Sequence, residues 1–204
     1  MGIKTSIVAG VACLAVAVPV ALAANINGTP NSEPLFGTNA ADVINAGAGN
    51  DFVGARRGHD VVRGEDGNDV LNGDRGNDRI AGGNGNDVMH GGPQHDVLFG
   101  QAGDDNLGGG YGHDTIVGGT GDDRAYGSYG HDTMWAGPGS DMLFGGPGHD
   151  VLIARADDSM VDYLFCGRGW DVAFARAEDI VDRSCERVVR ETAPPAVAED
   201  DAEV

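Results

Sequence analysis

An aspartate recurs at every ninth position through the middle of this chain, and this period constrains the fold more than any other feature. Two positions after each aspartate comes an apolar residue, and two positions before nearly every one comes glycine. A fixed period of this kind is typical of a solenoid, in which each repeat contacts only its neighbours and stacking builds one continuous core. The aspartates are Asp42, Asp51, Asp60, Asp69, Asp78, Asp87, Asp96, Asp105, Asp114, Asp123, Asp132, Asp141 and Asp150.

Each nine-residue unit is predicted to form a turn followed by a very short strand. In the unit 82–90, the first six residues are rich in glycine and asparagine, which tolerate the positive φ angles of a tight turn. The last three residues form the strand, and its middle residue, Met89, faces the interior. Because two units return the chain to the same side, residues eighteen apart should stack at about 4.8 Å. The prediction is an all-β fold, a flattened right-handed parallel β-roll (β-solenoid).

Stacking in steps of eighteen divides the aspartates between the two edges of the roll. The residue before the aspartate distinguishes these edges. On the edge that we call the histidine edge, it is histidine in five units, namely His59, His95, His113, His131 and His149. On the edge that we call the asparagine edge, it is Asn50, Asn68, Asn86, Asp104, Asp122 and Ser140.

Two rows of stacked carboxylates create an electrostatic problem. Two carboxylates about 5 Å apart repel by roughly 3 kcal/mol at an effective dielectric constant of 20. The chain has 32 acidic against 13 basic residues and a formal net charge of -19, so it offers little compensation of its own. A divalent cation between each stacked pair would make the interaction favourable. The ligands on offer are carboxylate and carbonyl oxygens, which calcium accepts in flexible geometry, whereas magnesium requires a tight octahedron.

We therefore expect multiple Ca²⁺ ions, with the repeat aspartates listed above as their ligands. One inward side chain in nine makes a thin core, so binding and folding should be coupled. The alternative is a metal-free solenoid in which aspartate serves only as a turn former. The negative charge disfavours nucleic acid and anionic membrane surfaces as partners.

The repeat resembles the RTX calcium-binding nonapeptide, G-G-x-G-x-D-x-U-x, from about Gly37 to Ile153. The units that carry the resemblance best are 82–90, 91–99, 109–117, 118–126 and 145–153. The resemblance implies calcium ions between same-side turns, held by the aspartates and by turn carbonyls. The least secure sites are expected in the turns that depart from the pattern, through Ala40, Ala46, Ala55, Gln94 and Ala136.

The segments outside the repeat divide into four. Residues 1–23 have the features of a signal peptide, with Lys4, an apolar run from Ile7 to Val20, and Ala21-Leu22-Ala23 as an A-x-A cleavage signal. This predicts a secreted protein, although an uncleaved membrane anchor is the alternative. Residues 24–35 are interpreted as an N-terminal linker, 36–153 as the roll, 154–190 as a C-terminal cap with degenerate repeats, and 191–204 as a disordered acidic tail.

Two cysteines, Cys166 and Cys185, remain after the predicted cleavage. An even pair in an exported chain predicts a disulfide, with two unpaired thiols as the alternative. The repeat slips by three residues after Ile153 and resumes at Asp162 and Asp171, so the bridge would close the cap over the end of the roll. The acids of this region could bind metal, but we favour their interpretation as acidic surface residues; they are Asp157, Asp158, Asp162, Asp171 and Asp179.

The row of histidines leaves alternatives open. It could bind a transition metal or sense pH. The alternative that we favour is that the position requires a left-handed backbone, which asparagine, aspartate and histidine tolerate.

A row of apolar residues at the last strand position also allows two interpretations. These residues are predicted to point outward, either as a partner surface or beneath the cap, through Trp170 and Phe174. They are Phe99, Val117, Trp135 and Ile153 on one sheet, and Tyr126 and Phe144 on the other.

No arrangement of catalytic residues is recognisable, and no serine lies in a nucleophile-elbow motif. We expect a secreted calcium-binding protein that is not an enzyme, has no membrane contact after cleavage, and folds outside the cell. The alternative function is a calcium-stabilised structural or adhesive surface module with an extracellular partner.

Overall fold

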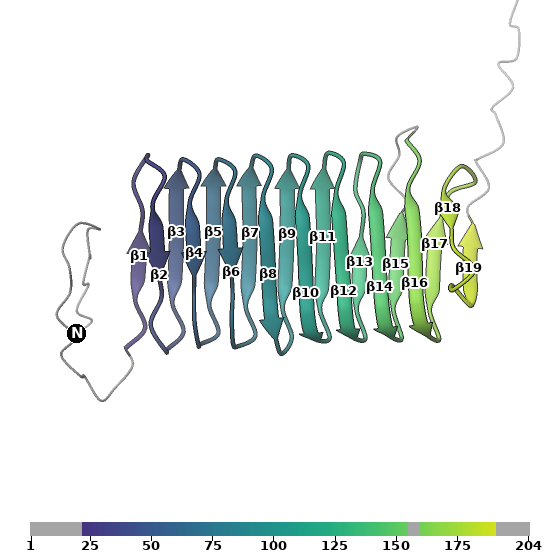
Figure 1. Ribbon diagram of the computed structural model, residues 1–204, viewed down its shortest axis with the longest axis horizontal. Coiled ribbons are helices and arrows are strands. Elements are labelled where there is room, and N and C mark those ends of the chain that lie inside the picture. The colour runs from purple at the N-terminus through teal and green to yellow at the C-terminus, as the bar shows by residue number, and fades with distance from the viewer. Residues whose placement is uncertain (1–21, 155–159, 191–204) are drawn as a thin grey trace, which may run out of the picture.

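The chain forms an elongated parallel β-solenoid, which confirms the predicted fold class. The structure is a computed structural model that describes residues 22–154 and 160–190, and these residues contain strands and loops but no helix. Successive strands alternate between two sheets while the chain advances along one axis (Figure 1). The predicted signal segment lies outside the described residues except for Leu22 and Ala23, and the predicted tail lies wholly outside them.

The odd-numbered strands form a ten-stranded sheet that we call the odd sheet. Its strands are β1 (Asn25–Asn27), β3 (Val43–Ala48), β5 (Val61–Asp66), β7 (Arg79–Asn84), β9 (Val97–Ala102), β11 (Thr115–Thr120), β13 (Thr133–Trp135), β15 (Val151–Ala154), β17 (Val172–Ala175) and β19 (Arg187–Arg190). The even sheet has nine strands. They are β2 (Pro34–Phe36), β4 (Phe52–Gly54), β6 (Val70–Asn72), β8 (Val88–Pro93), β10 (Asn106–Gly112), β12 (Arg124–Gly130), β14 (Met142–Gly148), β16 (Tyr163–Gly169) and β18 (Ile180–Val181).

Neighbouring strands pair in the predicted register of eighteen residues throughout the regular part of the roll. Ile80 of β7 pairs with Leu98 of β9, and Met89 of β8 pairs with Leu107 of β10. The apolar residue two positions after each repeat aspartate is fully buried, so these side chains form the predicted interior row. The row comprises Ile44, Val53, Val62, Leu71, Ile80, Met89, Leu98, Leu107, Ile116, Ala125, Met134, Leu143 and Leu152.

Most strands are longer than the three residues predicted from the repeat. Ten of the strands have six or seven residues, because pairing extends into the first positions of the next unit. Side-chain alternation therefore points the first residue of each unit inward as well. That residue is glycine in most units and is otherwise small, for example Ala46, Ala55 and Ala136, all fully buried. The core thus has a second inward column, which accepts only small residues.

Positive φ angles occur at the second and fourth positions of the units, as expected for tight turns. Gly85, at a fourth position, has φ +127°, and a Cβ atom added there would lie 2.1 Å from the carbonyl oxygen of Gly67 in the preceding coil. No side chain fits between the two backbones. Glycine at this position therefore allows the turns to stack as closely as the strands do.

The Gly85→Ala substitution should destabilise the folded protein by roughly 2–4 kcal/mol, through backbone strain and the clash with Gly67. The matched control is Gly108→Ala in β10, where an added Cβ would approach only the end of the flexible His90 ring, at 3.0 Å. Denaturant unfolding under identical conditions measures both variants. Equal losses of stability would contradict the role given to the turn glycine.

The roll begins earlier than predicted. Residues 24–35 were expected to be a linker, but they contain β1 and part of β2, which pair in register with β3 and β4. Ile26 lies beside Ile44, and Leu35 beside Val53 with 4% of its surface exposed. The segment has no aspartate repeat, but it has apolar residues at the inward positions, and these are sufficient to continue the core.

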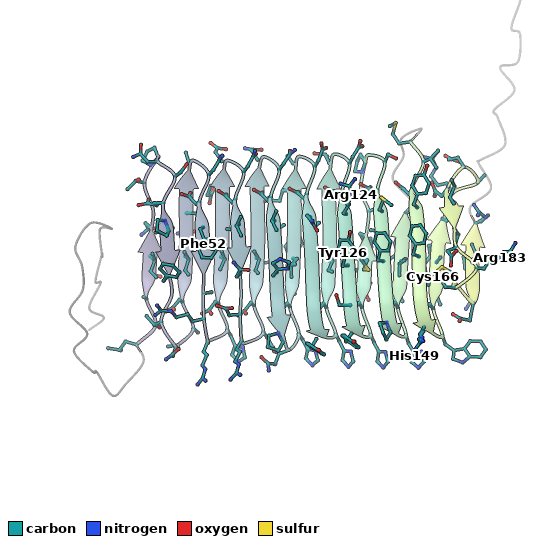
Figure 2. The ribbon with its side chains drawn as sticks, in the orientation of Figure 1. Phe52, Arg124, Tyr126, His149, Cys166 and Arg183 are labelled. Carbon is teal, nitrogen blue, oxygen red and sulfur yellow. A yellow bond between two sulfur atoms is a disulfide. The ribbon has the colours of Figure 1, made fainter. Side chains whose placement is uncertain are left out.

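The predicted cap continues both sheets rather than forming a separate unit. Across the three-residue slip, β14 pairs with β16 and β15 with β17 at a spacing of 21 residues, as Leu143 with Leu164 shows. The final pairs, β16 with β18 and β17 with β19, are joined by shorter connections. The predicted disulfide between Cys166 and Cys185 is present, with 5.0 Å between their Cα atoms (Figure 2).

The outward aromatic residues form stacked rows that the cap extends. Tyr126, Phe144 and Phe165 stack with ring centroids 4.9 and 4.8 Å apart. On the odd sheet, Phe174 pairs with Ile153 in the next strand and so continues the row, while Trp170 is 77% exposed. The interpretation that Trp170 and Phe174 cover these rows is therefore wrong. None of the described residues belongs to a helix that is long and apolar enough to cross a membrane.

Candidate metal centre

One oxygen of each repeat aspartate is bound to the main chain of the preceding coil. The backbone N–H of Asp78 donates to Oδ1 of Asp96 at 2.8 Å, and that of Asp96 donates to Oδ1 of Asp114 at 2.8 Å. The same bond recurs along both edges at 2.7–2.9 Å, from Asp42 with Asp60 to Asp132 with Asp150. The aspartates thus form two continuous carboxylate ladders, one along each edge of the roll.

The second carboxylate oxygen, Oδ2, is buried without a protein partner in most rungs. Burying a charged oxygen without a hydrogen bond or a counter-ion costs several kcal/mol, so native structures rarely repeat such an arrangement. Here it repeats once per turn, which indicates positions for a bound cation. The aspartates concerned are Asp51, Asp60, Asp69, Asp78, Asp87, Asp96, Asp105, Asp114, Asp123, Asp132, Asp150 and Asp171.

Burial raises the pKa values of the ladder aspartates far above the usual range. The pKa rises to about 7 for Asp87, Asp96, Asp123 and Asp150, chiefly because the carboxylate loses its hydration. The main-chain hydrogen bond opposes this rise in pKa, and neighbouring carboxylates add to it. Desolvation therefore outweighs the repulsion between neighbours that the sequence suggested as the main obstacle. A cation bound between the carboxylates would offset both effects.

The oxygens that surround each Oδ2 atom suit a hard cation. A Cβ atom added to Gly82 would lie 2.2 Å from Oδ2 of Asp87 and 2.8 Å from the carbonyl oxygen of Gly100, so these two oxygens converge on one region. Across the described ranges, no group of three or more His, Cys, Asp or Glu side chains could hold a metal. The oxygens that converge here are one carboxylate oxygen and one main-chain carbonyl, both of which calcium accepts readily.

The structure distinguishes the irregular turns. Gln94 has φ +85°, and its Oε1 accepts the N–H of Gly76 at 2.9 Å, so this turn keeps its shape and Asp96 keeps its place in the ladder. Asp42 differs from the other rungs, because its Oδ2 accepts the N–H of Thr38 at 2.5 Å. Its Oδ1 accepts the N–H of Ala24 at 2.6 Å. Asp42 is therefore the predicted ligand that the structure favours least.

Both ladders continue beyond the predicted sites. The N–H of Asp141 donates to Oδ1 of Asp162 at 2.9 Å, and the N–H of Asp150 donates to Oδ1 of Asp171 at 2.8 Å. Asp162 and Asp171 are 3% and 1% exposed, so the interpretation of these acids as surface residues is wrong. The sequence carries a signal for them, because nine residues separate Asp162 from Asp171 and an apolar residue follows each two positions later.

The histidines form a hydrogen-bonded row of stacked rings. The N–H of His113 donates to Nδ1 of His95 at 2.7 Å, and the N–H of His131 donates to Nδ1 of His113 at 2.8 Å. Consecutive rings from His95 to His149 lie 4.8–4.9 Å apart. Asparagine does the same on the other edge, where Oδ1 of Asn68 accepts the N–H of Asn86.

The explanation by a left-handed backbone is therefore wrong. None of the described histidines has a positive φ angle. The position requires a side-chain acceptor that reaches the next coil, which asparagine, aspartate and histidine share. A neutral imidazole that accepts at Nδ1 carries its proton on Nε2, so the exposed nitrogen lacks the lone pair that zinc or copper needs. The geometry thus opposes a transition-metal site on this row.

Replacing His113 by leucine should lower the free energy of unfolding by about 1–2 kcal/mol, because the N–H of His131 loses its acceptor. His113→Asn should cost much less, since asparagine already takes this position at Asn77, where its Oδ1 accepts the N–H of His95 at 3.3 Å. Thermal unfolding at saturating calcium compares the two variants. The acceptor role would be contradicted if His113→Asn lowered the free energy of unfolding as much as His113→Leu.

The fold and the two ladders define an acidic nonapeptide β-roll, a class of repeat protein whose turns present carboxylate and carbonyl oxygens to a cation. Comparison with protein families agrees with this class. The model of the RTX calcium-binding nonapeptide repeat (4 copies) matches residues 27–62, 55–89, 63–98, 81–116, 108–143, 117–152 and 135–158. The chain belongs to the RTX calcium-binding nonapeptide repeat family. No curated protein matches the chain.

Proposed function

We propose that this chain is a secreted calcium-binding protein that folds when several Ca²⁺ ions bind between its stacked turns. The observation that carries the proposal is the repeated Oδ2 atom, buried in rung after rung with no hydrogen-bond partner. One such atom could be an isolated exception, but a series with the period of the fold supports a common counter-ion at neutral pH. Membership of the RTX family supports calcium as that ion.

The proposed ligands are the repeat aspartates from Asp42 to Asp150, together with turn carbonyls. Two carboxylates in each gap would neutralise one divalent ion, and the carbonyls would complete an all-oxygen shell. The chain's own residues would contribute the geometry: the Oδ1 bond fixes the carboxylate, and the small residue at the first position leaves room beside Oδ2. We assign the chain no catalytic role.

Adjacent aspartates on the asparagine edge provide a matched test. Asp105 is a buried rung, whereas Asp104 is exposed and occupies a position where asparagine occurs in other units. Asp105→Asn and Asp104→Asn remove the same charge. We expect Asp105→Asn to raise the calcium concentration at half-folding by roughly tenfold or more, because this rung borders two gaps, and Asp104→Asn to change it little.

Isothermal titration calorimetry of residues 24–204 gives the number of bound calcium ions, and far-UV circular dichroism gives the folding midpoint. If the wild-type protein bound no calcium, or if both variants behaved like it, the proposed ligand role of the ladder would be refuted. Export is tested separately, by mass spectrometry of the protein recovered from the medium.

The exposed aromatic rows favour a second candidate function, a calcium-stabilised adhesive module. Tyr126 is 37% exposed, and its ring begins the stacked row on the even sheet. Co-sedimentation with isolated cell-wall material, with and without calcium, tests this function. Loss of binding in a Tyr126→Ser, Phe144→Ser double variant would support this function. Unchanged binding would contradict a role of the aromatic rows in adhesion.

A further inference from the structure

The two carboxylate ladders end differently at the C-terminal end of the roll. On the asparagine edge, the last rung is Asp179, whose Oδ1 accepts the N–H of Asp162 at 3.2 Å. Its Oδ2 accepts the N–H of Arg176 at 2.6 Å, so both oxygens have protein partners. The ladder on this edge is therefore complete without a further ion at its end.

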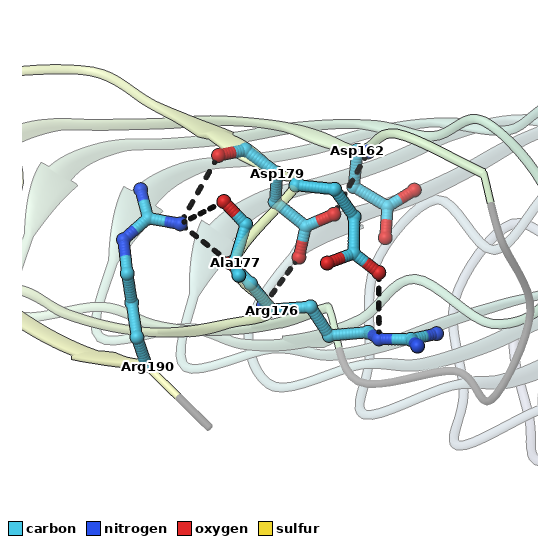
Figure 3. A network of polar contacts seen from close by, with 6 residues as sticks. Asp162, Arg176, Ala177, Asp179 and Arg190 are labelled. Atoms are coloured by element: carbon cyan, nitrogen blue, oxygen red, sulfur yellow. Dashed lines mark hydrogen bonds and ion pairs between the residues drawn. The ribbon is translucent and has the colours of Figure 1, made fainter. Parts of the chain in front are cut away.

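A cation from the chain itself occupies the carbonyls of this last turn. Nη1 of Arg190 donates to the carbonyl oxygens of Arg176, Ala177 and Asp179 (Figure 3). In addition, Arg176 forms an ion pair with Glu178, with 3.0 Å between Nε and Oε1. A guanidinium group thus closes the asparagine edge, in a place where carbonyl oxygens would otherwise need another cation or water.

The histidine edge ends on a carboxylate instead. The pairing of Val172 with Arg187 brings Glu186 into register with Asp171. The N–H of Asp171 donates to Oε2 of Glu186 at 2.8 Å, as the N–H of Asp150 donates to Oδ1 of Asp171 at 2.8 Å. Glu186 therefore takes the place of a ladder aspartate, although it lies outside the repeat.

Asp171 retains the feature that marks a cation position. Its side chain is 1% exposed, and its Oδ2 has no hydrogen-bond partner. Within the ranges that the structure describes, no arginine forms an ion pair with Asp171 or Glu186. Glu186 is exposed, so this end of the ladder is open to ions from solution.

The disulfide holds the two turns together. Cys166 begins the turn that ends at Asp171, and Cys185 directly precedes Glu186. The N–H of Gly167 also donates to Oγ of Ser184 at 3.1 Å. The covalent bond thus keeps the two carboxylates in register where the aspartate repeat has ended.

We propose that Asp171 and Glu186 bind a terminal calcium ion on the histidine edge, whereas Arg190 replaces such an ion on the asparagine edge. The family model matches residues only up to 158, so this site lies outside the matched repeats. The proposal rests on the proposed function, because it takes calcium as the ion that the ladders bind. Since Glu186 is exposed, the terminal site should bind calcium more weakly than the interior sites.

Glu186→Gln tests the proposal, because glutamine keeps an acceptor for the N–H of Asp171 but removes the charge. The matched control is Glu178→Gln, which removes the same charge at the end of the asparagine edge. Equilibrium dialysis of oxidised residues 24–204 against calcium counts the bound ions. We expect one ion fewer per chain for Glu186→Gln and no loss for Glu178→Gln.

The outcomes separate the two proposals. If the wild type binds calcium and Glu186→Gln binds as many ions, the terminal site is refuted and the proposed function stands. If the wild type binds none, both fail. Should Glu186→Gln lack the wild-type circular dichroism spectrum at saturating calcium, Glu186→Asp decides instead: loss of one ion or weaker binding of the last ion supports the site, and an unchanged isotherm overturns it.

Discussion

Chelation of calcium at pH 7 is expected to abolish most of the β-structure of residues 24–204. Without a cation, the buried ladder aspartates must either ionise in a dry environment or take up protons. The pKa of Asp87 and of Asp96 rises to about 7, and that of Asp105 to about 6. Each pKa unit corresponds to about 1.4 kcal/mol, so each such ionisation opposes folding by roughly 3–5 kcal/mol.

The sum of these costs exceeds the stability of an ordinary domain. Folded domains have a free energy of unfolding of only about 5–15 kcal/mol, so the cost of ionising a few ladder aspartates is comparable to that entire free energy. The core contributes little additional hydrophobic stabilisation. Its second inward column holds only glycine, alanine or cysteine, where a larger domain would place leucine or phenylalanine. Neutralisation of the ladder by calcium is therefore expected to decide whether the roll forms.

Far-UV circular dichroism of residues 24–204 measures this effect in excess EGTA and during calcium addition. We expect a largely unfolded spectrum in EGTA, full recovery in calcium, and little recovery in an equal concentration of magnesium. A β-rich spectrum with an unchanged melting temperature in EGTA would show that the buried carboxylates need no metal ion.

Acidification is expected to restore part of the β-structure of the metal-free chain. The ladder aspartates have higher pKa values in the folded than in the unfolded state, where the value is near 3.8. Protonated rungs therefore favour the folded state. Their contribution to stability is fully present below pH 4 and is lost as the pH rises through about 6–7, where Asp78 and Asp123 ionise.

The calcium-bound protein should show the opposite trend. Protons compete with calcium for the same carboxylates, so the calcium concentration at half-folding should rise as the pH falls below about 7. Circular dichroism between pH 4 and pH 8, in EGTA and at fixed calcium concentrations, measures both trends. If the metal-free chain gained no structure at pH 4, desolvation of the ladder could not be what keeps it unfolded at neutral pH.

Much of this architecture was accessible from the sequence, because the repeat acts through local chemistry. The nine-residue period predicted the stacking of residues eighteen apart, and Ile80 beside Leu98 confirms it. Glycine at Gly85 predicted a turn with positive φ, and the structure has one. The cysteine pair predicted the Cys166–Cys185 disulfide. Each prediction needed only the preferences of a few neighbouring residues.

Other features depend on contacts that no local pattern contains. The linker assignment of residues 24–35 failed because strand pairing, not the aspartate repeat, extends the sheets. The backbone explanation for His113 failed because its Nδ1 meets an N–H eighteen residues away. Arg190 lies in no recognisable motif, yet it binds three carbonyls of an earlier turn.

The sequence by itself determined the period, the inward and outward faces, and the two rows of aspartates, since these follow from residue spacing and chain reversal. Only the tertiary structure decided how the carboxylates of most rungs are used, with Oδ1 bound to the neighbouring coil and Oδ2 left buried without a partner. It also decided how the ladders end, with Arg190 on one edge and Glu186 on the other. The physical reason is that hydrogen bonding and desolvation depend on which atoms adjacent coils bring together, and the last coils depart from the repeat.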